Sequence, residues 1–431
     1  MNKLIFLLIL FFLSNCSLNE NSKIWTKDQI ESQKQEKLKN VFKDDKKIVE
    51  EFNSELRIDL ENIKNNNKIV DNRNNYGSLS YNGDFKKIES FKFKKLKNIN
   101  KLNHHPIFLN DGLIFFENKG TIINYNNNNR VIWKNNYYSK AEKKLFPKLY
   151  FVKENQNLII ADTISKIYSI DINTGNLNWS RNNTYPFNSD IKKYNKKFFV
   201  IDYKNTLRCY FINDGSECWN VKTEGSFTLS NTKTSLILLD DKIIFNNSVG
   251  EITAVNIETG MLLWQLPTQS SDIIYETYNF QTSELVSDDN SIYFSNNKNE
   301  FYSVDINSGA INWTNEINSH IAPIIIKNLI FTISNEGFLY VIEKNKGNII
   351  RITDVYSQYK DNKRSKIKPV GFSIGNKKLY LTNSDGKIII VNLSTGEIIN
   401  VVKVSRNLIS KPYIFDNNLY LIKNGKIDKY N

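Results

Sequence analysis

A glycine turn followed four residues later by tryptophan recurs along the chain, and this repeat restricts the fold more than any other feature. Its clearest copy reads Asp-Ile-Asn-Thr-Gly-Asn-Leu-Asn-Trp and ends at Trp179. An alternating strand, a glycine able to take positive φ and a second short strand are typical of a β-hairpin. The complete copies are Gly175–Trp179, Gly215–Trp219, Gly260–Trp264 and Gly309–Trp313.

Three further copies are degenerate. Asn129 replaces the glycine ahead of Trp133, and asparagine is the commonest other residue at positive φ. Gly347 and Gly396 keep the turn but are not followed by tryptophan. Successive turn positions are 46, 40, 45, 49, 38 and 49 residues apart. A period in the forties, built from four short strands, is typical of a β-propeller blade.

The tryptophans of the repeat are predicted to be packing residues. A blade cannot bury its own outer face, so a large aromatic side chain that docks on the next blade is what stacking requires. Five of the six tryptophans in the chain lie in this register: Trp133, Trp179, Trp219, Trp264 and Trp313.

The strand count predicts eight blades. The last unit has only three expected strands, at 413–415, 419–422 and 427–430, while an unassigned alternating strand at 88–93 precedes the first unit. A ring closed by pairing these ends hides two sheet edges. We therefore expect an all-β domain over residues 85–431, an eight-bladed propeller of four-stranded antiparallel blades closed by the N-terminal strand.

The N-terminus reads as an export signal. Lys3 precedes an apolar run at 4–13 that is too short to span a bilayer, and Cys16 follows the run after Ser14 and Asn15. Residues 1–16 resemble a bacterial lipoprotein signal peptide whose lipobox cysteine, Cys16, is lipidated, although Asn15 departs from the usual small residue. Ser17 in place of aspartate implies outer-membrane sorting. The alternative is an ordinary secretory signal with an incidental cysteine.

Residues 17–84 are polar, rich in Lys, Glu and Asn, and without sustained periodicity. They are predicted to be a tether whose removal through residue 80 leaves the ring intact.

Composition and motifs indicate no catalytic, cofactor or metal residues. The net charge is +13, but no basic cluster with interleaved aromatics stands out, so no nucleic-acid partner is predicted. The sequence contains none of the nucleotide, hydrolase or zinc-protease motifs. His104, His105 and His320 have no partner at metal-ligand spacing, and a loop or surface position is expected for them.

Cys209 and Cys218 flank the turn that contains Gly215, nearly opposite each other on two strands of one hairpin. In an exported protein such a pair can form a cross-strand disulfide. Register decides the outcome, since a slip of one residue places the two side chains on opposite faces. The sequence leaves both arrangements open.

The repeat Asp-x-x-Thr-Gly-x-x-x-Trp resembles that of quinoprotein (PQQ-type) propellers, over about 106–431. Some members are dehydrogenases that bind the quinone and calcium. Others form the BamB family of lipoproteins in the outer-membrane β-barrel assembly machinery, and this sequence is more similar to them because of its lipobox and undecorated repeats. That resemblance implies a non-catalytic periplasmic scaffold without a cofactor. The alternatives are a quinoprotein oxidoreductase and a periplasmic propeller that binds another protein or a polysaccharide.

The resemblance also implies partners and contact loops. A BamB-like protein is expected to bind the POTRA domains of the BamA-type barrel insertase, to reach the outer membrane through its lipid anchor, and to assist unfolded outer-membrane protein precursors. The matching loops here are 223–235 and 268–282. Their candidate interface residues are Phe227, Leu229, Tyr275, Glu276 and Tyr278. The arginine that follows in the family is replaced by Ser230 and Asn231.

Overall fold

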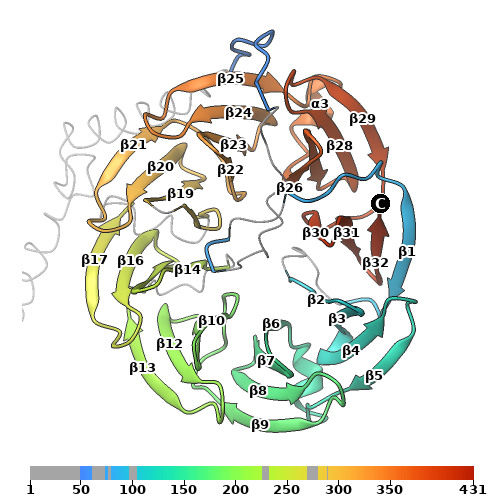
Figure 1. Cartoon of the computed structure of the whole chain (residues 1–431), viewed down its shortest axis with the longest axis vertical. Coiled ribbons are helices and arrows are strands. Elements are labelled where there is room, and N and C mark those ends of the chain that lie inside the picture. Colours follow the sequence, from blue (N-terminus) through green and yellow to red (C-terminus); the bar gives the residue numbers. More distant parts are fainter. Residues whose placement is uncertain are drawn as a thin grey trace, which may run out of the picture. The chain divides into compact units, whose positions relative to one another are not determined.

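The computed structural model describes residues 49–60, 73–75, 79–96, 104–225, 233–268, 280–288 and 290–431. The chain divides into two compact units, Met1–Glu50 and Glu51–Asn431. The second unit contains eight four-stranded antiparallel sheets arranged as blades around a common axis (Figure 1). The predicted all-β, eight-bladed propeller is therefore confirmed.

In blades one to seven the strands run in chain order from the axis to the rim (Figure 1). The blades are, in order, β2 (Ile107–Leu109), β3 (Gly112–Glu117), β4 (Thr121–Asn126) and β5 (Val131–Asn135); β6 (Leu149–Glu154), β7 (Asn157–Asp162), β8 (Lys166–Asp171) and β9 (Leu177–Asn182); β10 (Lys192–Tyr194), β11 (Lys197–Ile201), β12 (Thr206–Phe211) and β13 (Glu217–Lys222); β14 (Leu236–Leu238), β15 (Lys242–Asn246), β16 (Glu251–Asn256) and β17 (Leu262–Pro267); β18 (Val286–Ser287), β19 (Ser291–Asn296), β20 (Glu300–Asp305) and β21 (Ile311–Asn315); β22 (Ile324–Ile326), β23 (Leu329–Ile333), β24 (Phe338–Glu343) and β25 (Ile349–Asp354); and β26 (Pro369–Gly375), β27 (Lys378–Asn383), β28 (Lys387–Asn392) and β29 (Ile398–Lys403).

The second and third strands of the blades supply most of the core. Strand β3 reads Gly-Leu-Ile-Phe-Phe-Glu and is buried along its whole length, and β15 is buried likewise. Both faces of such a strand are covered by neighbouring blades, so its central residues form an apolar run rather than an alternating pattern. The rim strand β5 is instead exposed or half-buried.

The N-terminal strand completes blade eight. Strand β1 (Lys87–Lys92) pairs antiparallel with β32 (Lys426–Tyr430), with Phe91 opposite Ile427, beside β31 (Asn418–Lys423) and β30 (Tyr413–Phe415). Figure 1 shows the blue β1 at the rim of the red C-terminal blade. The predicted closure of the ring is confirmed, and it joins the two ends of the propeller in one sheet.

Each tryptophan of the repeat lies against the turn glycine of the next blade, as Trp133 lies against Gly175. Four of the five indole N–H groups donate to the carbonyl three residues before that glycine: Trp133 to Ile172 (2.7 Å), Trp179 to Ile212 (3.0 Å), Trp264 to Ile306 (3.0 Å) and Trp313 to Lys344 (2.9 Å). Trp219 packs on Gly260, but its Nε1 has no acceptor among the described residues.

At the interface between blades six and seven, Arg351 occupies the repeat position that tryptophan holds in the preceding blades. The Arg351 side chain is fully buried. Its guanidinium donates to the Leu393 carbonyl at 2.8 Å, three residues before Gly396, which is the acceptor position that tryptophan uses elsewhere. It also donates to Ser394 O (2.5 Å) and to Leu56 O (3.0 Å). Leu56 belongs to the N-terminal segment.

Residues 51–60, which we call the N-terminal clamp, cover this interface. Phe52 and Ile352 exchange two backbone hydrogen bonds of 3.1 and 2.9 Å, and the Ile58 amide donates to Ser394 O at 2.9 Å. Ile58 and Leu60 are 7% and 3% exposed and join the core cluster of blades six and seven. Arginine has less apolar surface than the tryptophan of the other interfaces, and Ile58 and Leu60 of the clamp add apolar contact beside it.

A second N-terminal stretch packs between blades seven and eight. Tyr81 is fully buried with its ring 5.2 Å from that of Tyr380, and Phe85 stacks on Tyr430 at 4.4 Å. The segment predicted as a polar tether, residues 17–84, therefore contains residues that belong to the propeller core. Periodicity does not reveal them because they are isolated apolar anchors in a polar segment.

Strand β1 should determine the stability of the whole ring. Phe91 is 2% exposed and meets the ring of Tyr125 in blade one at 5.7 Å, so we expect Phe91→Ala to lower the free energy of unfolding by about 3–5 kcal/mol. On the same strand Ile88 is 51% exposed, and Ile88→Ala should change it by less than about 0.5 kcal/mol. Urea denaturation of both variants checks this; equal effects would contradict closure by β1.

Candidate functional site at the ring axis

A β-bulge precedes the docking position in seven blades. In each last hairpin the register shifts by one residue there, as at Cys218, which has no partner while Cys209 pairs with Trp219 and Tyr210 with Glu217. The bulged residues are Ile132, Asn178, Cys218, Leu263, Asn312, Ile350 and Ile399. A bulge turns its side chain away from the regular alternation.

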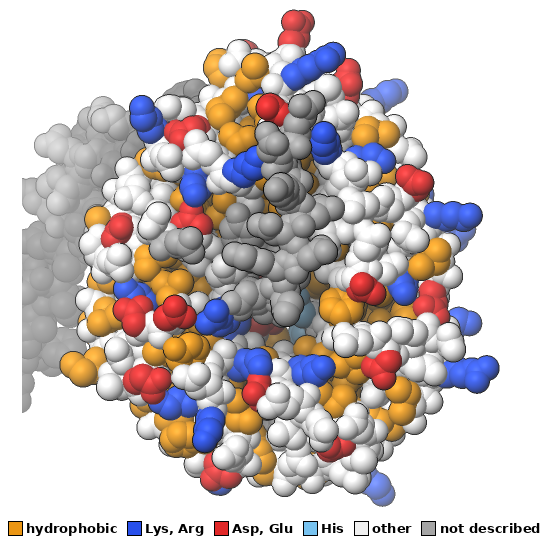
Figure 2. Space-filling model, in the orientation of Figure 1, with side chains coloured by type: hydrophobic (Ala, Val, Ile, Leu, Met, Phe, Trp, Pro, Cys, Tyr) orange, Lys and Arg blue, Asp and Glu red, His pale blue; other side chains and the backbone are white. Residues whose placement is uncertain are grey.

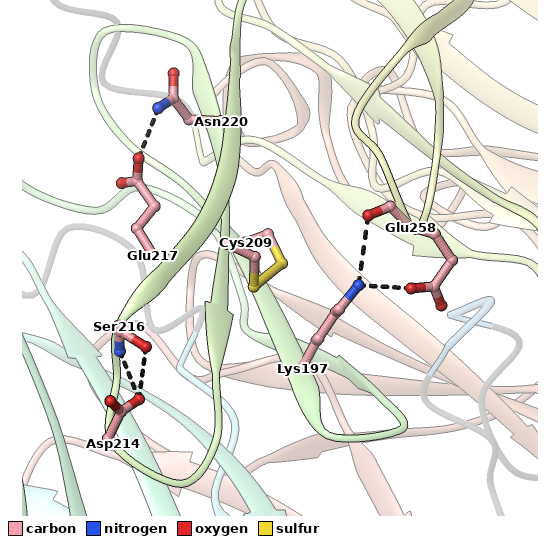
Figure 3. The surroundings of a disulfide bond; sticks show 8 residues. Lys197, Cys209, Asp214, Ser216, Glu217, Asn220 and Glu258 are labelled. Atoms are coloured by element: carbon pink, nitrogen blue, oxygen red, sulfur yellow. Dashed lines mark hydrogen bonds and ion pairs between the residues drawn. A yellow bond between two sulfur atoms is a disulfide. The ribbon is translucent and has the colours of Figure 1, made fainter.

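Cys209 on β12 and Cys218 on β13 form a disulfide (Figure 3). The equivalent positions in blades two and five carry Asn178 with Ser169 and Asn312 with Ser303, and these pairs are joined by 3.3 Å hydrogen bonds. The bulge therefore brings the two side chains of this position to one face of the hairpin. Figure 3 also shows Lys197 binding Glu258 Oε2 of the next blade at 2.5 Å.

Several predicted site residues lie outside the described part of the chain. These are the lipidation residue Cys16 and the candidate contact residues Phe227, Leu229, Tyr275, Glu276 and Tyr278. The described ends of the two loops show that each runs from a rim strand, β13 or β17, to the innermost strand of the following blade, β14 or β18. Within the described ranges, no helix has the length and apolar character needed to cross a membrane.

Charged side chains converge at the axis from one repeat position, two residues before the innermost strand. This position holds His105, Asp190, Glu284 and Lys411, ahead of β2, β10, β18 and β30 respectively. Lys233 lies just before β14, and Lys192 begins β10. We call these six residues the axial cluster. Figure 2, drawn in the orientation of Figure 1, shows basic, acidic and histidine side chains near the centre of the ring.

Ion pairs connect the axial cluster across blades. Lys233 Nζ lies 2.5 Å from Asp190 Oδ2, and Lys411 Nζ lies 2.7 Å from Glu284 Oε2. His105 Nε2 stands between the two carboxylates, 3.6 Å from Asp190 and 4.0 Å from Glu284. Blades one, three, four, five and eight are thus joined through one polar network.

The network keeps its carboxylates ionised. Burial raises the pKa of Asp190, but Lys233 and His105 outweigh burial and hold it at about 2. Burial is likewise outweighed at Glu284, where Lys411 and His105 hold the pKa well below its usual range. Burial lowers the pKa of Lys192 to about 8. At neutral pH three ammonium groups thus face two carboxylates.

The expected loop position of His104 and His105 is correct, but that loop is at the axis rather than on the surface. His104 is 8% exposed, its ring lies 5.2 Å from that of Phe116, and its Nδ1 lies 3.2 Å from the Leu149 carbonyl. Burial, followed by the charges of Lys233 and Lys148, lowers the pKa of His104 to about 3. Burial also lowers the pKa of His105.

One imidazole and two carboxylates are a ligand set that divalent cations use, and the ligand atoms of His105, Asp190 and Glu284 lie within 4.8 Å of one another. Here Lys233 and Lys411 already bind the two carboxylates, so a cation would have to displace both ammonium groups. The sequence analysis missed this cluster. Aligning the blades on their first strands, rather than on the tryptophan turns, would have placed the four charged residues in one column.

The fold and the axis together define an eight-bladed propeller of PQQ-type repeats with an ion-paired centre. The profile of a protein family described as "Outer membrane protein assembly factor BamB" matches residues 102–353 of this chain. That match spans more than half of the sequence, and the chain belongs to this family. The resemblance inferred from the repeat is therefore confirmed.

Solved structures of several kinds share the fold. BamB from Moraxella catarrhalis is 16% identical with a TM-score of 0.66, over 80% of this chain and 99% of that one. The computationally designed Ika8 protein (12% identity, TM-score 0.60, 79% and 99% covered) and a europium-containing methanol dehydrogenase (12%, 0.60, 78% and 84%) are also similar. No curated protein sequence matches the chain.

The buried His104 predicts an acid-sensitive fold. Its pKa is about 3 when folded and near 6.5 when unfolded, so the unfolded chain binds more protons between these values. Stability present above pH 6.5 should fall as the pH is lowered, by about 1.4 kcal/mol per pH unit from this group. Between pH 4 and 6 the unfolding free energy of His104→Gln should depend less steeply on pH than that of the wild-type chain. The expected difference in slope is about 1.4 kcal/mol per pH unit, the contribution of one proton. Identical slopes would contradict the assignment.

Proposed function

We propose that this protein is a non-catalytic scaffold of outer-membrane β-barrel assembly. The observation that carries the proposal is the family match over residues 102–353, together with a ring of eight four-stranded blades. In this role the propeller binds the barrel insertase and assists the insertion of outer-membrane proteins.

A lipid anchor at Cys16 would hold the protein at the periplasmic face of the outer membrane. Support comes from the apolar run at 4–13, from Cys16 shortly after it and from Ser17 next to the cysteine. A lipidated cysteine with several acyl chains binds a bilayer firmly, whereas a single chain binds marginally. Residues 17–50 precede the clamp and would connect the anchor to the ring.

The proposed contact surface is formed by loops 223–235 and 268–282. Each loop starts after a rim strand, β13 or β17, and ends before the innermost strand of the next blade, β14 or β18, so the described ends of the two loops belong to neighbouring blades. Phe227, Leu229, Tyr275 and Tyr278 provide the apolar and aromatic residues typical of interface centres, and Glu276 provides a charge at the rim. The POTRA domains of a BamA-type insertase are the proposed partner.

The charged axis supports a scaffold rather than an oxidoreductase. Calcium in a quinoprotein-type site requires several free oxygen ligands. At the axis of this ring each of the two carboxylates, Asp190 and Glu284, is bound by a lysine ammonium instead. Such pairs join blades to one another and fix the centre of the ring.

Binding of the purified POTRA domains tests the proposal. We expect the wild-type protein to bind, and Phe227→Ala with Leu229→Ala to weaken binding at least about tenfold, since truncating interface anchors costs 2 kcal/mol or more. Leu177→Ala is the matched control, because Leu177 is an equally apolar residue, 47% exposed, on the rim of blade two. Calorimetry measures both affinities.

Fractionation of cells that contain either protein tests the localisation. Lipidated protein should sediment with outer membranes, while Cys16→Ser should be released into the soluble periplasm. Absence of POTRA binding by wild-type protein, or equal loss in the loop and control variants, would overturn the scaffold assignment. A Cys16→Ser protein that still sediments would overturn the anchor alone.

A further inference from the structure

A short piece of the N-terminal segment, residues 73–75, lies against the axial edges of two blades. The Leu238 amide of β14 donates to the Arg73 carbonyl at 2.9 Å, and the Ser287 amide of β18 donates to the Asn74 carbonyl at 3.2 Å. Residues 73–75 form a turn, and Asn75 has a φ of 59°, so the edge amides bind the carbonyls of a turn rather than of an extended strand. Residues 73–75 thus bridge the inner edges of blades four and five.

The next side chain makes specific contacts. Asn75 Nδ2 donates to the Leu285 carbonyl at 2.8 Å and lies 3.4 Å from both Ser235 Oγ and Leu236 O. Its Oδ1 accepts a hydrogen bond from the Lys192 ammonium. Lys192 and Ser235 are only 7% and 6% exposed. One carboxamide therefore satisfies a buried cation and buried carbonyls from three different blades.

This arrangement discriminates among side chains. A carboxylate would bind Lys192 but could not donate to Leu285 O, and an aliphatic side chain would leave both groups without this partner. A carboxamide has both a donor and an acceptor, so asparagine or glutamine fits the position. The two backbone hydrogen bonds before it are accepted by carbonyls of a turn, and the positive φ of Asn75 is a conformation that asparagine adopts readily.

We propose that the inner edges of β14 and β18, together with Lys192, form a binding site for a polypeptide turn with a carboxamide side chain, supplied by another protein. Residues 73–75 mimic such a turn and block the site in cis. Because residues 73–75 belong to the same chain, their effective concentration at the site exceeds that of a free ligand, so they exclude weaker ligands in trans. Withdrawal of the N-terminal segment would open the site.

The inference goes beyond the proposed scaffold role and does not depend on it, because the probe is this chain's own sequence. The test compares the full chain with a variant in which residues 71–77 are replaced by a glycine-serine linker of equal length. Both versions keep the clamp and strand β1. The ligand is a fluorescent synthetic peptide with the sequence of residues 70–79, and fluorescence anisotropy measures its binding.

We expect the peptide to bind the linker variant at least about tenfold more tightly than the wild-type chain. Lys192→Met in the linker variant should weaken binding about tenfold or more, as should peptides in which Asn75 is replaced by alanine or aspartate. Lys193→Met is the matched control, since the neighbouring lysine pairs with Glu154 instead. The peptide variants test the same contact without altering the protein.

Hydrogen exchange locates the bound segment. The amides of Leu238 and Ser287 should be protected in the wild-type chain, exchange freely in the linker variant, and regain protection when unlabelled peptide is added. Equal peptide binding to both proteins would overturn the proposal, since the peptide would then bind elsewhere. If the linker variant has the melting temperature of the wild-type chain but does not bind the peptide, the proposal is also overturned. Residues 73–75 would then have only an intramolecular packing role.

Discussion

Docking of one hairpin residue onto the turn of the next blade is the interaction on which the ring depends. The indole of Trp179 covers Gly215, where an added Cβ would come within 2.4 Å of the ring, so the close approach requires glycine. The indole N–H then satisfies a carbonyl of that same turn, as Trp179 does with Ile212. Apolar burial and one directed hydrogen bond thus fix the spacing and the tilt of neighbouring blades.

The interface without tryptophan shows what this contact has to provide. Arg351 makes the same directed hydrogen bond, to the Leu393 carbonyl, but it lacks the aromatic surface of tryptophan. A buried guanidinium needs further acceptors, and its Nη1 donates to the carbonyls of Leu56 and Ser394, whereas its Nε has no acceptor among the described residues. The N-terminal clamp therefore supplies both an acceptor for the arginine and the apolar side chains of Ile58 and Leu60.

The repeat in the sequence predicts the blade count, the strand order and the closure by β1, because these follow from local periodicity and from the need to hide edges. Other features depend on contacts between distant positions. The pairing of Cys209 with Cys218 depends on a bulge, which alternation does not encode. The axial cluster joins Asp190 to Glu284 through His105, from blades that are far apart in the chain, and Tyr81 is one aromatic residue in a polar stretch.

The central claim is that residues 51–60 are part of the propeller and complete its interface at Arg351. Thermal unfolding of two truncations tests it most directly, one lacking residues 17–48 and one lacking residues 17–60. The shorter deletion should leave the melting temperature unchanged. The longer one should lower it by several degrees, because it removes the buried Ile58 and Leu60, each contributing about 1.5–3 kcal/mol. Equal melting temperatures would show that the ring is complete without the clamp.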